Sequence, residues 1–151
     1  MVNSSLIYIK KDGKYLMMHR VKKENDLNKD KWIGIGGKFE EGESPEDCCR
    51  REAKEETSLL LGKMNYRAII TFVTENETEY MHLFTCSDFS GTLKENCDEG
   101  KLEWVDIHEV YNLPIWEGDK VFLKLIEKDD TPFFSLKLVY ENGVLKEHVL
   151  Y

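Results

Sequence analysis

Three glutamates at helical spacing, Glu52, Glu55 and Glu56, are the side chains of this sequence best placed to do chemistry. Successive helical residues advance by about 100°, so the three carboxylates fall within one arc of about 100°. A hard cation such as Mg²⁺ or Mn²⁺ takes oxygen ligands, relieves the repulsion between such carboxylates and bridges them to phosphate. The spacing alone also allows a surface charge ladder in which these acids pair with neighbouring arginine and lysine residues.

The segment that carries these glutamates has the signals of a helix. Ser44 is a candidate N-cap, Pro45 suits the first helical position, and Glu46 and Asp47 complement the positive end of the helix dipole. We therefore predict a helix over residues 44–59 that follows a glycine turn. The acidic residues of this segment therefore have different roles: Glu46 and Asp47 stabilise the helix start, whereas Glu55 and Glu56 lie on the same side of the helix as Glu52.

The rest of the chain predicts a mixed sheet and a second helix. Two hairpins are expected at glycine dipeptides, Asp12-Gly13 and Asn142-Gly143. Short β-rich runs predict further strands at 66–74, 80–89 and 102–107. Apolar spacing predicts a helix over 119–128, and the polar residues 21–31 predict a loop. This order indicates the α+β class: a mixed β-sheet with helices packed on it, in one domain over residues 1–151.

Composition restricts the partners. With 41% hydrophobic and 33% charged residues, the 151-residue chain is expected to fold in water. It has no bilayer-length apolar run and no signal peptide, so we expect a cytoplasmic protein without a membrane partner. The net charge of -8 argues against a nucleic acid polymer, although not against a small phosphorylated ligand held through metal. Four cysteines lack the spacing of a zinc site or a disulfide framework: Cys48, Cys49, Cys86 and Cys97.

A longer pattern is more specific than the helix alone. Gly37, five residues, Glu43, seven residues and then "REAKEETSL" from Arg51 to Leu59 resemble the Nudix box, the signature of hydrolases that act on nucleoside diphosphates linked to another group. The resemblance implies an α/β/α sandwich in which the box forms a loop, a helix and a loop. It also implies that Arg51 and Glu43 pair and brace the loop on the helix, whereas spacing alone offers Arg51 an i to i+4 pair with Glu55.

The resemblance further implies a divalent metal site for Mg²⁺ or Mn²⁺. Its ligands would be Glu52, Glu55, Glu56 and the Gly36 carbonyl. The box does not name the general base. Glu56 is the first candidate, and Glu99, in "NCDEGKLEW", is an acidic candidate to complete the site.

One residue departs from the box. Ser58 stands where the family has a glycine that suits a left-handed helix cap. A non-glycine residue in that conformation costs about 1 kcal/mol or shifts the helix end. We therefore expect altered geometry after Thr57, with the metal ligands, which all precede it, left in place.

Other segments bear on the substrate. "KWIGIGGKFEEGES", "LEWVDI" and "LPIWEGDKVFLKLI" are similar to MutT-type and mammalian oxidised-purine nucleoside triphosphatases. The similarity implies that Trp116 stacks on a purine and that Asp119 reads its edge. Alternatively, Trp116 belongs to the core and Asp119 is the N-cap of the second helix. Lys38 is a candidate phosphate contact or a solvent lysine, and Ile33 stands where the mammalian relative has a polar base-contacting residue.

The resemblance thus implies Mg-dependent hydrolysis of purine nucleoside triphosphates to monophosphate and pyrophosphate, with oxidised nucleotides such as 8-oxo-dGTP among the candidates. One alternative is a hydrolase of nucleoside diphosphate sugars or dinucleotides. The other is a non-catalytic Nudix domain that senses a nucleotide. In each case the partner is a small-molecule nucleotide, and the chain is a monomer or a homodimer.

Overall fold

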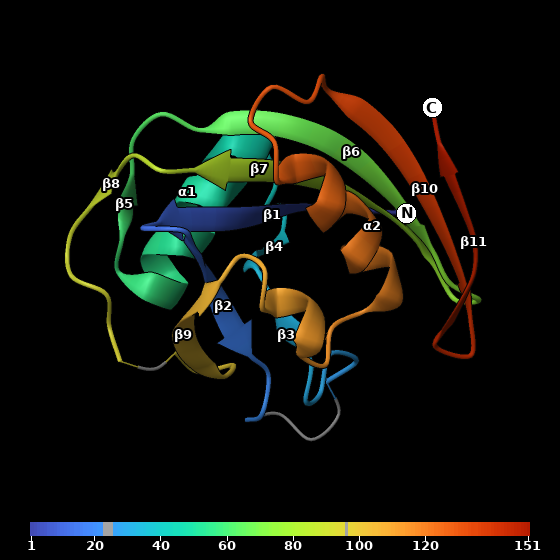
Figure 1. The fold of residues 1–151 in the computed structure, drawn as a ribbon, viewed down its shortest axis with the longest axis horizontal. Coiled ribbons are helices and arrows are strands. Elements are labelled where there is room, and N and C mark those ends of the chain that lie inside the picture. Colours follow the sequence, from blue (N-terminus) through green and yellow to red (C-terminus); the bar gives the residue numbers. More distant parts are fainter. Residues whose placement is uncertain (23–25, 96) are drawn as a thin grey trace.

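The computed structural model describes residues 1–22, 26–95 and 97–151, and Figure 1 shows their arrangement. Within these residues, nine strands form the large sheet: β1 (Val2–Lys11), β2 (Lys14–His19), β3 (Trp32–Ile33), β4 (Ile35–Lys38), β6 (Asn65–Val73), β7 (Thr78–Cys86), β9 (Lys101–Asp106), β10 (Phe134–Glu141) and β11 (Val144–Leu150). A small sheet pairs β5 (Leu60–Leu61) with β8 (Phe89–Ser90). The helices are α1 (Pro45–Thr57), α2 (Glu117–Ile126) and a 3-10 turn at Val110–Asn112.

The strand β1 pairs with three other strands of the large sheet, β7, β4 and β2. It runs parallel to β7 along most of its length and antiparallel to β4 over residues 4–7. Its end, Lys10–Lys11, pairs with the start of β2. The path of the sheet is β11-β10-β6-β7-β1-β2-β3, with β4 on β1 and β9 on β2. Parallel and antiparallel pairs coexist, so the predicted mixed sheet is confirmed.

Alternate residues of β1 pack into two separate cores. Ile7 and Ile9 belong to the cluster that contains Cys49 and Ala53 of α1. Tyr8 belongs to the other cluster, where its ring lies 6.2 Å from the ring of Phe122 in α2. Side chains of successive strand residues point to opposite faces, so α1 and α2 cover opposite faces of the sheet, and both can be followed in Figure 1. Neither helix in the described part of the chain has the length and hydrophobicity that a bilayer-spanning segment requires.

The predicted hairpins are confirmed. The backbone φ angles are 51° at Asp12 and 73° at Gly13, and 52° at Asn142 and 77° at Gly143. Two consecutive positive φ values are the conformation that such two-residue turns require. The predicted strands at 66–74, 80–89 and 102–107 correspond to β6, β7 and β9. Of the predicted loop over 21–31, residues 23–25 lie outside the described residues.

The second helix begins earlier than predicted. It starts at Glu117, and its N-cap is Trp116 rather than Asp119. The Asp119 N–H donates to the Trp116 carbonyl at 3.0 Å, which places Asp119 inside the first turn. The alternative interpretation of Asp119 as the N-cap was therefore wrong, because the N-cap is Trp116, three residues earlier in the sequence.

The predicted distortion after Thr57 was also wrong. α1 ends at Thr57, and Ser58 adopts the left-handed cap itself, with φ 67° and ψ 8°. The Ser58 N–H donates to the Lys54 carbonyl at 3.0 Å, and the Leu59 N–H donates to Thr57 Oγ1 at 3.0 Å. These hydrogen bonds stabilise the cap geometry. The left-handed conformation of Ser58 is therefore unfavourable by itself, but the helix end does not move.

Replacing this serine by glycine should stabilise the protein. Ser58→Gly relieves the left-handed strain at the C-cap and is expected to raise the free energy of unfolding by about 0.5–1 kcal/mol. Urea unfolding with an unchanged m-value measures it. The matched control is Ser90→Gly in β8, which has no positive φ and should be neutral or destabilising. An equal change in the free energy of unfolding in the two variants would show that Ser58 is not strained.

Candidate functional site

The N-terminus of α1 is fixed by a reciprocal cap. The Asp47 N–H donates to Ser44 Oγ at 3.0 Å, and the Ser44 N–H donates to Asp47 Oδ2 at 3.1 Å. Pro45 occupies the first turn, as its fixed φ favours. This capping box sets where the helix starts. The 3.6-residue period of the helix then determines which glutamates face β4.

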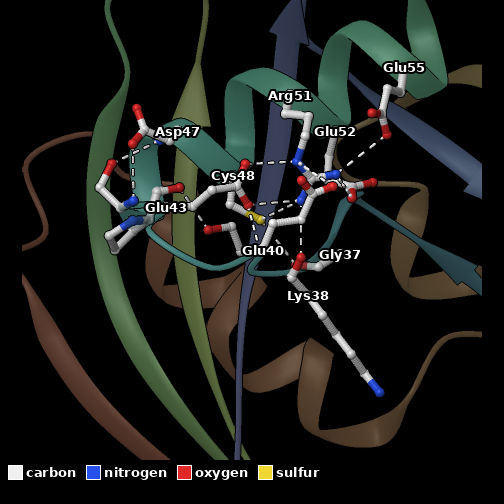
Figure 2. Close-up of polar contacts among 12 residues, drawn as sticks. Gly37, Lys38, Glu40, Glu43, Asp47, Cys48, Arg51, Glu52 and Glu55 are labelled. Carbon is white, nitrogen blue, oxygen red and sulfur yellow. Dashed lines mark hydrogen bonds and ion pairs between the residues drawn. The ribbon is translucent and has the colours of Figure 1, made fainter.

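Arg51 is the centre of the polar contacts around α1 (Figure 2). Its Nε and Nη2 donate to the two carboxylate oxygens of Glu43 at 2.7 and 2.9 Å. Its Nη1 lies 2.6 Å from Glu52 Oε1 and 3.4 Å from Glu55 Oε2, and Nη2 also donates to the Lys38 carbonyl at 3.1 Å. The Arg51–Glu43 pair implied by the resemblance is therefore present, and the i to i+4 contact with Glu55 accompanies it at a longer distance.

This pairing has an electrostatic signature. The hydrogen bonds from Arg51 lower the pKa of Glu43 to about 2. The pKa of Arg51 rises, first because Glu43 accepts its hydrogen bonds. A bidentate arginine–carboxylate pair is geometrically specific, so the loop that carries Glu43 is held in one orientation against the helix.

Two glycines allow β4 to approach its neighbours closely. A Cβ atom on Gly37 would lie 2.7 Å from the Glu52 carboxyl group, and one on Gly36 would lie 1.9 Å from the Ser5 carbonyl oxygen. Real Cβ atoms do not come this near to other heavy atoms. Glycine at these positions therefore lets the backbone of β4 lie between β1 and the carboxylates of α1.

Glu56 is the most buried of the box carboxylates, with 6% of its surface exposed. Its Oε2 accepts the Gly36 N–H at 3.2 Å. Burial, followed by the negative charges of Glu52 and Glu99, raises its pKa to about 8. Burial also raises the pKa of Glu52, and Glu99 again contributes. Glu99 therefore lies within electrostatic range of both, as its prediction as part of the site requires.

These residues fit a hard divalent cation in the chemistry of their donors, which are all carboxylate oxygens. Glu56 forms no ion pair with the described residues, so a cation there would neutralise a buried charge. However, no three His, Cys, Asp or Glu side chains in the described ranges stand at metal-binding spacing. Glu52 and Glu55 both contact Arg51, and the Glu55 side chain is 59% exposed. The metal ligands, including the Gly36 carbonyl, remain predictions.

A cavity of about 550 Å³ lies next to this cluster, on the side of Gly36 and Gly37. Gly36, Gly37 and Lys38 of β4 line it, and so do Trp116 and Asp119. Its walls include four apolar side chains, Leu6, Ile33, Phe72 and Met81. Charged residues also line it, among them Arg20, Asp26, Glu77 and Glu79, and its volume is typical of a small-molecule site.

Asp119 is a buried carboxyl group in the lining of this cavity. Only 6% of its surface is exposed, and its carboxylate makes no hydrogen bond or ion pair with the described residues. Burial raises its pKa to about 7, partly offset by the positive charge of Lys31. A buried carboxylate without a partner is costly, so a ligand that donates hydrogen bonds to it would stabilise it.

The remaining predicted residues lie along the same cavity. Trp116 is half-buried and meets the ring of Tyr140 edge-on at 5.2 Å, so it contacts the core and lines the cavity at once. Ile33 forms part of the wall. Lys38 lines the cavity near Gly37, and in Figure 2 its amino group points away from the Arg51 contacts. Its side chain is exposed, so both interpretations of this lysine stay open.

Arg20 was missed by the sequence reasoning. It lines the cavity, lowers the pKa of Glu56 by its charge, and its Nε donates to Asp26 Oδ2 at 2.6 Å. The available signal was a basic residue at the end of a predicted strand, next to a polar loop. That signal is weak, because most such residues face solvent.

Comparisons with known proteins are consistent with this geometry. A family model described as the NUDIX domain matches residues 2–126. Among curated relatives, an oxidized purine nucleoside triphosphate hydrolase of Danio rerio is 32% identical over 106 residues, which cover 69% of this chain and 67% of that protein. The uncharacterised Nudix hydrolase YvcI of Bacillus subtilis is 31% identical over 102 residues, covering 64% of this chain and 65% of that protein. The matches therefore span about two thirds of the relatives' length.

Solved structures show the same fold. A MutT protein from Bacillus halodurans superimposes with a TM-score of 0.88 at 23% identity and covers 99% of this chain and 97% of its own. The E. coli ORF135 protein gives a TM-score of 0.70 at 26% identity, with 82% of this chain and 86% of its own covered. The fold comparison thus includes the β10–β11 hairpin, which lies beyond the family match.

Replacing Arg51 by lysine should lower the stability of the protein. Arg51→Lys keeps the charge but cannot donate to Glu43, Glu52 and the Lys38 carbonyl together, so the free energy of unfolding should fall by about 1–3 kcal/mol. Urea denaturation measures it. Lys54→Arg, an exposed change on the same helix, is the control and should be neutral. An Arg51→Lys protein as stable as the wild type would show that the bidentate pair contributes nothing.

Proposed function

Because the chain belongs to the Nudix family, as the match over residues 2–126 shows, we propose that it hydrolyses purine nucleoside triphosphates to the monophosphate and pyrophosphate in a reaction that depends on a divalent cation. The observation that carries this proposal is that one cavity is lined both by Gly36 and Gly37, which lie against Glu56 and Glu52, and by Trp116 and Asp119. We assign these two groups of residues to its carboxylate end and its base end. A nucleotide has the same two ends, a polyphosphate and a base. The name of the Danio rerio relative supports the purine assignment.

At the carboxylate end, Glu52, Glu56 and Glu99 are the candidate ligands, together with Glu55 and the Gly36 carbonyl. A bound Mg²⁺ or Mn²⁺ would neutralise phosphate charge and lower the pKa of a coordinated water. Arg51 orients Glu52 from the side, through the 2.6 Å contact. Arg20 and Lys38, which both line the cavity, are the cations available to the phosphate chain.

Glu56 is our candidate general base. It is buried beside Glu52, and the raised pKa means that it can hold a proton near neutral pH. A group whose pKa is near the working pH can accept a proton from water and release it again. Cation binding nearby would lower that pKa, so the proton affinity of Glu56 depends on what the site holds.

At the base end, Asp119 and Trp116 supply recognition. The Asp119 carboxylate can accept two hydrogen bonds from adjacent N–H groups, which is the pattern on the Watson–Crick edge of guanine. The indole of Trp116 and the apolar walls suit the faces of a purine ring. Ile33 adds no hydrogen bond, so Asp119 is the main polar reader of the base. We include oxidised guanine nucleotides such as 8-oxo-dGTP, which keep this edge, in the proposed substrate class.

The first test removes the proposed ligands one at a time. Glu52→Gln and Glu56→Gln keep size and hydrogen bonding but remove the negative charge, and each should lower kcat/KM for dGTP at saturating Mg²⁺ by about 100-fold or more. Pyrophosphate release measures turnover, and Glu46→Gln, exposed in the first turn, is the control with the same charge change. Undiminished turnover in both variants would remove the metal assignment. Nucleoside diphosphate sugars assayed in parallel test the competing substrate class.

The second test uses the titration of Asp119. Above its pKa of about 7 the carboxylate accepts both guanine donors, and below it the protonated form loses one acceptor. The KM for dGTP should therefore rise several-fold as pH falls from about 8 to about 6. Asp119→Asn should have a high KM that does not follow pH. A wild-type KM that is flat across this range would contradict recognition by the carboxylate.

The same group gives a stability test with a defined sign. The folded pKa of Asp119 is raised above its unfolded value, so ionisation costs stability as pH rises from about 4 through about 7. Asp119→Asn removes this cost. The variant should therefore gain stability relative to the wild type at pH 8 but not at pH 4, which urea titrations at the two pH values will measure.

A further inference from the structure

Residues 26–31 form a compact turn beside the cavity. The Asn28 N–H donates to Asp26 Oδ1 at 3.0 Å, and the Lys31 N–H donates to the Asn28 carbonyl at 2.8 Å. Two backbone hydrogen bonds join this turn to the end of β2, from Asp30 to the Arg20 carbonyl at 2.6 Å and from Arg20 to the Lys31 carbonyl at 2.9 Å. The turn is therefore held by the sheet, and its residues 26–28 line the cavity.

One side chain of this turn reaches the base end directly. The indole Nε1–H of Trp116 donates to Asn28 Oδ1 at 2.7 Å, across 88 residues of sequence. An indole nitrogen can only donate, so the acceptor must be the amide oxygen. Asn28 is half-buried, and its oxygen is the hydrogen-bond partner of the indole in the described structure.

The same turn also contacts a face of the ring. Lys31 Nζ lies over the Trp116 indole, 5.1 Å from its centroid. Phe72 and Tyr140 meet the indole at interplanar angles of 79° and 82°. The backbone of Trp116 serves as the N-cap of α2, and its side chain makes no capping hydrogen bond. The ring plane is therefore set by side-chain contacts, and Asn28 supplies the directional one.

The turn connects this ring to the carboxylate end. The Arg20 and Asp26 side chains pair at 2.6 Å and are 15% and 8% exposed. Arg20 acts on Glu56 through its charge, whereas Asp26 holds the backbone of Asn28. Arg20, Asp26, Asn28 and Trp116 thus form a continuous series of contacts along one side of the cavity.

We propose that Asn28 is a positioning residue for base recognition, which holds the plane of the Trp116 indole so that a purine ring can pack against it. This inference rests on the proposed function, because it assigns the base to the Trp116 end of the cavity. Asn28 acts through Trp116 and not by reading the base itself. Its contribution must therefore disappear when the indole is removed.

The hydrogen bond itself is tested by NMR, without any substrate. The indole N–H signals of Trp32, Trp104 and Trp116 are assigned with Trp116→Phe. Asn28→Leu should shift the Trp116 signal upfield and speed its hydrogen exchange at least several-fold, while the other two indole signals stay in place. Asn28→Asp, which keeps an acceptor oxygen, should retain a slowly exchanging signal. An unchanged Trp116 signal in Asn28→Leu would overturn the proposal.

The functional part is tested by a double-mutant cycle on product binding, with dGMP as the probe. Asn28→Leu should weaken dGMP binding about fivefold, the size expected for one lost hydrogen bond. In the Trp116→Phe background the same change should have no further effect, because the indole is gone. Turnover of dGTP should show a raised KM with little change in kcat. Asn112→Leu, an exposed residue of the 3-10 turn, is the matched control.

The outcomes separate the two proposals. If Asn28→Leu weakens dGMP binding equally with and without the Trp116 indole, Asn28 does not act through Trp116, and the positioning role is overturned. If the double-mutant cycle on dGMP binding gives the predicted result but the wild type hydrolyses no purine triphosphate, the proposed activity is refuted. The role of Asn28 in base binding then stands. If dGMP does not bind at all, both fall.

Discussion

The bidentate pair between Arg51 and Glu43 is the interaction on which the arrangement of the site depends. α1 carries several carboxylates next to a packed sheet, where their repulsion is poorly screened. Arg51 is the cation that lies among them, and it contacts Glu43, Glu52 and a backbone carbonyl together. A lysine has one donor group and could not satisfy this set. The loop before α1 is consequently held at a fixed distance from the helix.

Close packing of the backbone complements this pair. Because Gly36 and Gly37 have no side chains, β4 lies against β1 on one side and against Glu52 on the other. Glu56 is buried next to this strand, and its pKa is raised by burial and then by the negative charges of Glu52 and Glu99. The site therefore combines a neutralised outer carboxylate, Glu43, with an inner one that holds its proton more tightly. Environments that push two carboxyl groups apart in pKa are typical of functional sites.

A second buried carboxyl group, Asp119, lines the same cavity, together with Trp116. Asp119 is buried without a partner, and Trp116 is held among aromatic rings, Lys31 and Asn28. Burial of a carboxylate is costly unless it is paired, which is why we assign Asp119 to ligand binding in the proposed function. In the proposed function, recognition by Asp119 would depend on its protonation and hydrolysis would depend on a cation near Glu52 and Glu56.

Local rules were enough for most of the elements and for the box, although they misplaced the start of α2 and the geometry after Thr57. Helix capping at Ser44, the two positive-φ turns and the period-2 strands depend on residues close in sequence, and these predictions were confirmed. The i, i+3, i+4 spacing placed Glu52, Glu55 and Glu56 on one side of α1, and a longer pattern predicted the pair of Arg51 with Glu43. Tertiary packing decided the rest: that Glu56 is buried while Glu55 is exposed, that Ser58 keeps the left-handed cap, that Asp119 is buried and not an N-cap, and that Arg20 and Asn28 line the cavity. Burial, pKa and contacts across 88 residues depend on which surfaces the folded chain brings together, and no local spacing in the sequence encodes that distance.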